Sequence, residues 1–305
     1  SGQDRVTAPL WEMDFGNDAD NVTPLTVTKC SQSQAHTCVI LSNGDLRCFG
    51  SNSYGQLGLG ISDQTAKVGL LLSDFTDADK VVDLGDDAGD GTGTKYTAKE
   101  VHAGIGGGTC AIRSDDKVVC WGSNSVGCHG LNGGKTWNGG TFKRGLGTSG
   151  SLMGNNLVIS QLGVGGSTSY SAAKFGASYG ADVNNHAYSI CVIMTDGTAK
   201  CLGLKLLAGQ DMTGGWPYEY LGGSEGEMVD LGFINFGGDT VETITTGKDF
   251  ACAIMSDLET IRCWGSNTYG QLGYGTTDSW GVHPSTNKMA NLPAKVLVGS
   301  GYKSA

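Results

Sequence analysis

The sequence predicts an all-β fold built from repeated units, and three observations support that prediction. One motif with a pair of cysteines recurs along the chain, at Cys38–Cys48, Cys110–Cys120, Cys191–Cys201 and Cys252–Cys263. Glycine accounts for 51 of the 305 residues, whereas charged residues make up only 16%. Short apolar runs are separated by turn residues, which is typical of many short strands joined by tight turns and long loops.

Each cysteine pair flanks a turn and therefore marks a β-hairpin. Cys38 and Cys48, for example, are symmetric about Asn43-Gly44. Residues equidistant from a hairpin turn face each other closely enough to form a disulfide, so we predict one bridge within each hairpin. Cys252–Cys263 encloses one extra residue, which a longer loop or a bulge would absorb. Closing so short a loop should stabilise the fold by about 2–3 kcal/mol per bridge.

Two further short apolar segments precede each hairpin, which gives four strands per unit at a period of about 70 residues. The segments predicted to open the units are 12–16, 81–85, 157–163 and 228–232. The segments predicted to follow them are 25–30, 101–104, 173–177 and 241–247. We expect a single domain, residues 1–305, with repeat units at 12–80, 81–156, 157–227 and 228–294 and a partial fifth at 295–305.

The first strand of several hairpins is apolar at successive positions, as in Cys38-Val-Ile-Leu41, Cys191-Val-Ile-Met194 and Cys252-Ala-Ile-Met255. Both faces of such a strand are expected to be covered. Four-stranded sheets covered on both faces by their neighbours are the blades of a β-propeller. The predicted fold is therefore a β-propeller of four-stranded blades with long glycine-rich loop insertions.

The motif resembles the repeat of the regulator-of-chromosome-condensation family. The resemblance lies in Cys-(Ala/Val)-Ile, a turn, and Cys-Trp-Gly-Ser-Asn-x-Tyr-Gly-Gln-Leu-Gly, and it is best kept at residues 36–58 and 248–273. It implies a β-propeller of four-stranded blades, usually seven. Family members include a nuclear exchange factor, ubiquitin-ligase domains, a plant light receptor and a bacterial enzyme inhibitor, so the fold does not fix the function.

Several polar residues of the motif are expected to be structural. Asparagine and glutamine side chains form tight connections by bonding to nearby backbone, so we predict this role for Asn52, Asn267, Gln56 and Gln271. His36 stands where the family repeat commonly has histidine. The five histidines show no metal-ligand spacing, and we expect His36 to pack in the interior.

Cysteine content and charge indicate the compartment and exclude some partners. Ten cysteines, most of them in pairs, indicate an oxidising compartment, so we expect a secreted, extracellular protein. No apolar run reaches about 20 residues, and we expect no membrane insertion. The net charge of −10 argues against nucleic acid as a partner.

No constellation of residues indicates catalysis, so we expect no enzymatic activity. Residues 176–180, Gly-Ala-Ser-Tyr-Gly, match a nucleophile elbow, but the helix that an elbow needs is not predicted after them. Residues 130–136 resemble a phosphate loop in which His129 replaces the first glycine.

Two smaller features leave alternatives open. Asp86, Asp87 and Asp90 lie among glycines and are weak candidates for calcium, although a solvated turn is the better explanation; we expect no other cofactor. Cys30 and Cys128 have no hairpin partner. We expect them to link the first two units by a disulfide, and an intermolecular bond or a free thiol is the alternative.

Two long insertions, residues 130–150 and 208–227, carry aromatic residues among glycines. Loops on a rigid scaffold are common recognition sites, and aromatic side chains are common anchors. The candidate binding residues are Trp137, Phe142, Trp216, Tyr218 and Tyr220. The alternative is that these rings cover the sheet edges.

We therefore expect a non-enzymatic extracellular module that binds a protein or a glycan. The alternative is a structural subunit of an extracellular filament or coat that self-assembles through strand or blade-face contacts. Residues 12–16 and 295–298 resemble the same strand of the repeat, so the chain could close on itself or donate a strand to a neighbour. We favour closure within one chain, because closure removes exposed edges without a partner.

Overall fold

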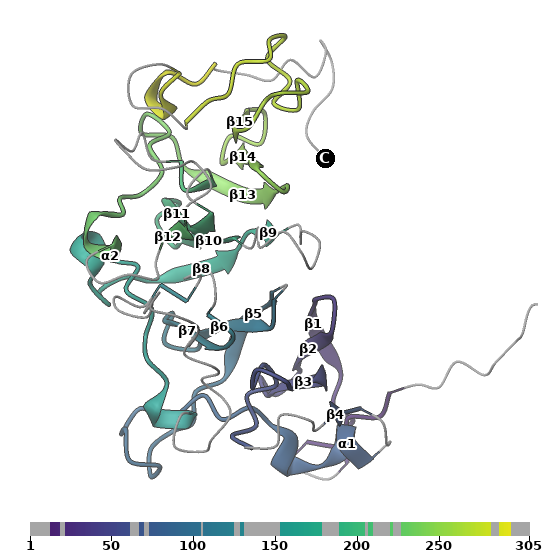
Figure 1. Ribbon diagram of the computed structural model, residues 1–305. Coiled ribbons are helices and arrows are strands. Elements are labelled where there is room, and N and C mark those ends of the chain that lie inside the picture. Colours follow the sequence, from purple (N-terminus) through teal and green to yellow (C-terminus); the bar gives the residue numbers. More distant parts are fainter. Residues whose placement is uncertain are drawn as a thin grey trace, which may run out of the picture.

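The computed structural model consists mainly of β-structure, arranged as four small sheets (Figure 1). It describes residues 13–18, 22–61, 67–69, 73–104, 106–124, 129–130, 153–178, 189–204, 207–209, 220–221, 227–281 and 287–293. Within these residues, α-helix is limited to two single turns, α1 (Ser73–Thr76) and α2 (Glu227–Asp230). The all-β prediction is confirmed.

The sheets are called the first to fourth blade in chain order. The first blade contains β1 (Val27–Gln32), β2 (His36–Leu41), β3 (Leu46–Ser51) and β4 (Lys67–Val68). The second contains β5 (Ala98–Ala103), β6 (Gly108–Arg113) and β7 (Val118–Gly122). The third contains β8 (Ala172–Phe175), β10 (Ser189–Met194), β11 (Ala199–Leu204) and β12 (Tyr220–Leu221). The fourth contains β9 (Ala177–Ser178), β13 (Val241–Thr246), β14 (Phe250–Met255) and β15 (Ile261–Gly265).

The four hairpins and their disulfides are confirmed. In each hairpin the two cysteines are direct cross-strand partners, and the S–S distances are 2.07, 2.06, 1.97 and 2.10 Å in chain order. The extra residue of the last hairpin lies in its loop, because β14 and β15 pair without a register shift. Leu258 takes the left-handed backbone conformation there, with φ 58°, at the place of Gly44 (φ 85°) in the first hairpin.

The segments predicted to open the units lie elsewhere than expected. Two of them, and Ile234 just after the segment 228–232, donate a backbone N–H to the third strand of the preceding blade, to the residue two positions before its second cysteine. The bonds run from Val82 to Leu46 (2.8 Å), from Ser160 to Val118 (2.9 Å) and from Ile234 to Ala199 (2.8 Å). The outer edge of a blade is therefore completed by the next unit of sequence, because the chain has to pass that edge on its way to the next blade.

One of these segments was also predicted with the wrong structure. Residues 228–232 were expected to be a strand, but they begin within the helical turn α2. Met228 and Leu231 are 0% and 2% exposed, and their i, i+3 spacing places both on one face of a helical turn. Burial of that face against the third blade decides the conformation.

The blades pack face to face in chain order, and their contacts form the core. Ile40 of the first blade packs in one cluster with Val119 and Trp121 of the second. Ile112 of the second packs with Val192 of the third, and Ile193 of the third packs with Trp264 of the fourth. Strands β6 and β10 are buried at every position, which confirms that both faces of these strands are covered.

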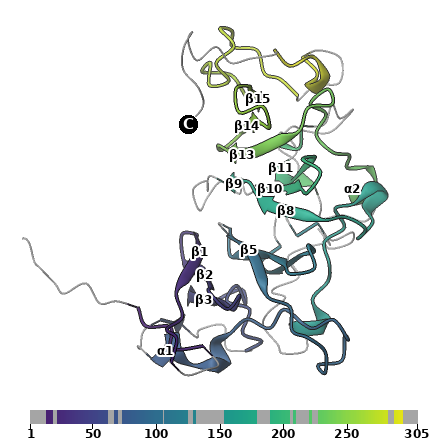
Figure 2. The same cartoon turned by 180° about the vertical axis from the view of Figure 1, so that it is seen from behind.

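The stack follows an arc. In both views the sheet of β13–β15 lies at the opposite end of the molecule from the sheet of β1–β4 (Figures 1 and 2). The predicted meeting of residues 12–16 with 295–298 cannot be followed, because residue 12 and residues 295–298 lie outside the described part of the chain.

Candidate interaction surfaces

The contact between the first two blades shows how this repeat holds its neighbour. The loop after β3 presents the backbone carbonyl of Gln56, which accepts hydrogen bonds from Thr109 Oγ1 (2.8 Å) and from Trp121 Nε1 (3.0 Å). Both donors belong to the second blade and are fully buried. The ring of Tyr54 lies against Gly107, where an added Cβ would be 2.7 Å from Tyr54 Cδ2. Gly107 therefore allows the close approach of the two blades.

The conformation of this loop is set by side chains within it. Asn52 Oδ1 accepts the Leu57 N–H (3.1 Å), and Gln56 Oε1 accepts the Tyr54 N–H (2.8 Å). The fourth blade repeats both bonds at 2.9 Å, from Leu272 to Asn267 and from Tyr269 to Gln271. The structural role predicted for these asparagine and glutamine residues is confirmed.

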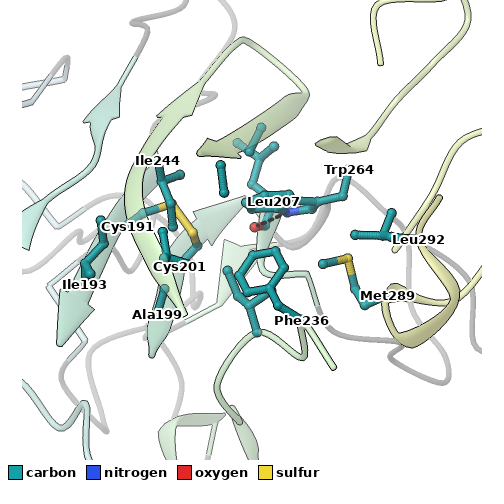
Figure 3. Close-up of a cluster of buried hydrophobic side chains, with 14 of the residues drawn as sticks. Cys191, Ile193, Ala199, Cys201, Leu207, Phe236, Ile244, Trp264, Met289 and Leu292 are labelled. Atoms are coloured by element: carbon teal, nitrogen blue, oxygen red, sulfur yellow. Dashed lines mark hydrogen bonds between the residues drawn. A yellow bond between two sulfur atoms is a disulfide. The ribbon is translucent and has the colours of Figure 1, made fainter. Parts of the chain in front are cut away.

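The contact between the third and fourth blades follows the same plan. Trp264 Nε1 donates a hydrogen bond to the Leu207 carbonyl (3.0 Å), and the Trp264 side chain is fully buried (Figure 3). Phe236 packs against the indole at a centroid distance of 5.5 Å in an edge-to-face arrangement. In both interfaces a tryptophan directly after the second cysteine reaches a loop carbonyl of the preceding blade.

His36 also belongs to the first interface. Its Nδ1 lies 2.7 Å from Ser33 Oγ and its Nε2 lies 2.9 Å from Thr109 Oγ1. Burial lowers the pKa of His36 to about 4, so the imidazole is neutral at physiological pH. His129, which stands at the place of Leu57, is likewise buried, and burial lowers its pKa to about 4. Packing of His36 in the interior is confirmed.

The first blade is closed on its outer side. Phe15 and Phe75 form one apolar cluster with Val39 and Leu41 of β2. The two phenylalanine rings are 5.8 Å apart in an edge-to-face arrangement. The guanidinium of Arg47 donates to the backbone carbonyl of Phe75, which ties the segment around α1 to β3. We call Phe15 and Phe75 the N-terminal cap.

The corresponding side of the fourth blade is only partly covered in the part of the chain that the structure describes. Its terminal face is defined as Phe250, Cys252 and Ile254 of β14, Ile261 of β15, and Tyr269. The first four are only half-buried, whereas their counterparts in the first blade, His36, Cys38, Ile40 and Leu46, are at most 3% exposed. Tyr269 is 92% exposed, against 42% for Tyr54. The sequence predicted that both sides of β14 are covered, and this is wrong for the described residues.

The first strands of the blades carry charged side chains of both signs. Lys29 of β1 pairs with Glu100 of β5, and Lys174 of β8 pairs with Glu242 of β13 at 2.5 Å. Lys99 of β5 pairs with Asp116 at 2.5 Å. Most residues of β1 are exposed. We call Lys29, Lys99, Glu100, Lys174 and Glu242 the first-strand surface.

The predicted binding residues are almost all outside the described part of the chain. This holds for Trp137, Phe142, Trp216 and Tyr218, whereas the backbone of Tyr220 lies in β12 and pairs with Leu204. Cys128, the expected partner of Cys30, is also outside it. Cys30 lies exposed on β1 and forms no disulfide with any described residue.

The carboxylates of the weak calcium candidates accept hydrogen bonds from other groups of the protein. The Asp86 carboxylate accepts hydrogen bonds from Asn155 Nδ2 (2.7 Å) and from the backbone of Ala88, Gly89 and Gly91. The bond from Asn155, followed by the backbone bonds, lowers the pKa of Asp86. Asp87 and Asp90 accept bonds from Thr94 and Thr92. The described residues contain no group of three or more metal-ligating side chains, and calcium binding stays a prediction.

The structure describes part of the motif that resembles a nucleophile elbow and one residue of the motif that resembles a phosphate loop. Ser178 of the elbow-like motif lies in β9, which pairs in parallel with β13. Gly130 is the only described residue of the phosphate-loop-like segment 130–136. In the part of the chain that the structure describes, no helix has the length and apolar character needed to cross a membrane.

Sequence inspection missed the cap and the carbonyl contact. Phe15 lies in the segment 12–16, which was predicted to open the first unit, and Phe75 belongs to no repeated pattern, so only the packing reveals their role in the cap. A signal for the contact was present in the residue after the second cysteine, which is Trp121 in the second blade but Phe49 in the first. Only the indole has an N–H to donate.

These features define a disulfide-cross-linked stack of β-propeller blades. The profile of the regulator of chromosome condensation (RCC1) repeat matches residues 27–56 and 241–271. These two segments therefore match the RCC1 repeat, and the resemblance noted in the sequence is confirmed. The comparison with the sequences of curated proteins finds no match.

Solved structures agree with this fold. Prp20p from Saccharomyces cerevisiae is similar with a TM-score of 0.50 and 16% identity, over 88% of this chain and 54% of that one. Human WBSCR16 has a TM-score of 0.48 and 15% identity, over 84% of this chain and 52% of that one. Yeast RCC1 (Prp20) in a structure with Kap60 has a TM-score of 0.47 and 16% identity, over 81% and 45%. This chain spans about half the length of the structures it matches. The similarity to Prp20p shows that its fold is that of an RCC1-like β-propeller.

Proposed function

We propose that the chain is a non-enzymatic, extracellular β-propeller module that binds a protein partner through the first-strand surface. The observation that carries the proposal is the set of exposed or half-buried lysine and glutamate side chains that form ion pairs on neighbouring first strands. Charges of both signs in a fixed arrangement favour a partner whose surface carries the complementary charges. They disfavour partners that would place like charges opposite each other. A glycan, the other ligand class expected from the sequence, is either uncharged or anionic, so it does not match a surface that carries charges of both signs.

The scaffold supports this proposal. Four hairpins are cross-linked by disulfides, which persist in oxidising compartments outside the cytosol. Rigid strands hold their side chains at fixed spacing, so less conformational entropy is lost on binding. Among the solved relatives, Prp20p is described by its binding to Gsp1p and histones, and yeast RCC1 by its complex with Kap60. Those partners belong to those proteins; for this chain the relatives support protein binding as a class.

Charge reversal tests the proposal. A variant with Lys29→Glu and Lys174→Glu is compared with a control of equal net charge, Lys95→Glu and Lys288→Glu, whose lysines are exposed elsewhere. Proteins of the extracellular fluid are captured on each immobilised chain, and the affinity of any captured protein is measured by biolayer interferometry. The control should keep the affinity and the reversal should lower it at least tenfold. Equal binding by both variants would exclude the first-strand surface.

Self-assembly is the second candidate, and the half-exposed terminal face favours it. An exposed apolar sheet face next to an aromatic side chain is typical of interaction sites. Sedimentation velocity at increasing concentration separates the two candidates. A monomer over the whole range supports the binding module, whereas concentration-dependent oligomers support the structural subunit.

A further inference from the structure

His36 lies in a chain of hydrogen bonds that crosses from the first blade to the second. Its Nε2 is 2.9 Å from Thr109 Oγ1, and the Thr109 hydroxyl donates to the Gln56 carbonyl at 2.8 Å. That hydroxyl has a single hydrogen, so towards His36 it can only accept. Nε2 therefore carries the ring hydrogen, and Nδ1 accepts from Ser33 Oγ at 2.7 Å. Nδ1 is the atom at which a further proton binds.

A proton on Nδ1 places a positive charge inside this interface. The hydrogen bonds can adapt, because the Ser33 hydroxyl has a second acceptor in the His36 carbonyl at 3.1 Å. The charge has no such remedy, because His36 is 3% exposed and burial disfavours the charged form. Burial accordingly lowers the pKa of His36 to about 4. The closed interface therefore requires the neutral imidazole.

The groups on the elements packed against His36 do not compensate for that charge. β2 packs against β1, β3 and β5, and His36 itself reaches β6. The charged side chains of these strands are each bound to another group: Lys29 to Glu100, Lys99 to Asp116, Arg113 to Asp115, and Arg47 to the Phe75 carbonyl. Cys30 of β1 and Tyr54 of the loop after β3 belong to types that are neutral in acid. His102 of β5 adds a second cation when it is protonated, and its pKa is lowered to about 4 by burial first and then by the charge of His36.

The same interface positions part of the first-strand surface. Lys29 of the first blade forms its ion pair with Glu100 of the second. Further along the same two strands, Ser31 Oγ accepts the Ala103 N–H at 2.9 Å. The two charges keep a fixed spacing only while the first two blades stay in contact.

We propose that protonation of His36 opens the contact between the first and second blades and thereby weakens partner binding at the first-strand surface, so that acid regulates this site. The regulation of binding rests on the proposed function. An exposed histidine titrates near 6.5, so the open form binds more protons than the closed form between pH 6.5 and pH 4. The ratio of closed to open interface should therefore fall about 20-fold between pH 7 and pH 5.

The contact between the third and fourth blades supplies an internal reference. Phe250 stands at the place of His36 in the fourth blade, and this contact contains none of the described histidines. It has an equivalent ion pair between first strands, Lys174 with Glu242. It also has an equivalent buried indole, because Trp264 bonds to a loop carbonyl as Trp121 does in the first interface.

The two ion pairs can be followed without a partner by a carbodiimide, which joins a lysine amine to a carboxylate in contact with it. The 305-residue chain is cross-linked at pH 7 and at pH 5, and the yields of Lys29–Glu100 and Lys174–Glu242 are measured by mass spectrometry. The ratio of the two yields cancels the effect of pH on the reagent. The relative yield of Lys29–Glu100 should fall at least twofold at pH 5. An unchanged ratio would overturn the proposal, because the interface then stays closed in acid.

Hydrogen exchange of the indole N–H groups shows whether His36 is the group that binds the proton. The exchange rate of Trp121 relative to that of Trp264 should rise about 20-fold from pH 7 to pH 5 if the first interface opens locally. The variant His36→Phe should abolish both this rise and the loss of cross-linking; His36→Gln replaces it if the first variant does not fold. His129→Leu is the matched control, because it removes a buried histidine outside this interface and should leave both effects intact. The same pH response in the His36 variant would overturn the proposal.

The last measurement concerns binding itself. Any protein captured at pH 7 through the first-strand surface should bind the wild-type chain at least fivefold more weakly at pH 5, and this loss should be absent in the His36 variant. Equal losses in both chains would overturn the regulation. Failure to capture any protein counts against the proposed function alone, since the cross-linking and exchange ratios need no partner.

Discussion

The first and fourth blades have similar sequences but different surroundings. Both match the RCC1 repeat profile, and both fold the same hairpin, disulfide and loop. In the first blade one side is covered by the second blade and the other by the N-terminal cap. In the fourth blade the described residues bury one side fully and leave the other half-exposed. The difference shows that the repeat folds its own backbone locally, but that burial of its two faces depends on neighbours.

The largest expected difference concerns one aliphatic position. Ile40 is 3% exposed between the first two blades, and its counterpart Ile254 is half-buried on the terminal face. Ile40→Ala should lower the free energy of unfolding by about 2–4 kcal/mol, because it removes buried methyl groups and leaves a cavity. Ile254→Ala should cost about 1 kcal/mol or less. Urea denaturation without reductant measures both; equal losses would show that the fourth blade is covered like the first.

Acid should affect the first and second interfaces, which contain the buried histidines His36, His102 and His129, more than the interface between the third and fourth blades. The pKa of His36 and of His102 is lowered by burial to about 4, whereas both titrate near 6.5 when unfolded. Between these values the unfolded chain binds more protons, so stability should fall as the pH drops from about 6.5 to about 4 and should be constant above that window. The loss at pH 4.5 should reach about 2–3 kcal/mol for each histidine.

The fourth blade supplies the control for this pH effect, because Phe250 stands at the place of His36. Hydrogen exchange resolved by residue should show β2 and β6 losing protection between pH 6.5 and 4.5 relative to β14 and β15. The variant His36→Phe should flatten the pH dependence. A uniform loss over all four blades would contradict a local origin.

The contact between tryptophan and the loop carbonyl should have a smaller effect. Trp121→Phe removes the indole N–H that bonds to Gln56, and we expect a loss of about 1 kcal/mol for the hydrogen bond. Trp264→Phe should have a similar cost, because it removes the bond to Leu207. Thermal unfolding of the two variants beside the wild type measures the effect. A stable Trp121→Phe variant would mean that apolar packing alone holds the blades together.

The smallest effect is expected at the exposed tyrosine. Tyr269 is 92% exposed, so Tyr269→Ser should change the free energy of unfolding by less than about 0.5 kcal/mol. Tyr54→Ser should cost more, because the Tyr54 ring packs against Gly107. The comparison uses the same urea titration. A large loss for Tyr269→Ser would reveal a contact to the ring that the described residues do not show.

The sequence by itself determined the local structure of this protein. Hairpin symmetry predicted the pairing of Cys38 with Cys48 and of its three equivalents, since residues opposite each other across a turn are close in any register that the turn allows. The motif also predicted that Asn52 and Gln56 hold their loop, because both bonds span only a few residues. Such features depend on neighbours in the chain and can be read from spacing.

Only the tertiary structure decided which side of each blade is covered and by what. The segment at Val82 completes the preceding blade instead of opening its own, the cap at Phe15 and Phe75 closes one end, and the face around Ile254 and Tyr269 stays half-exposed. The apolar run Cys252-Ala-Ile-Met255 has the same hydrophobic pattern as its buried counterparts, so the sequence could not show the difference. Burial is a property of the pair of surfaces in contact, and one strand specifies only its own half of that pair.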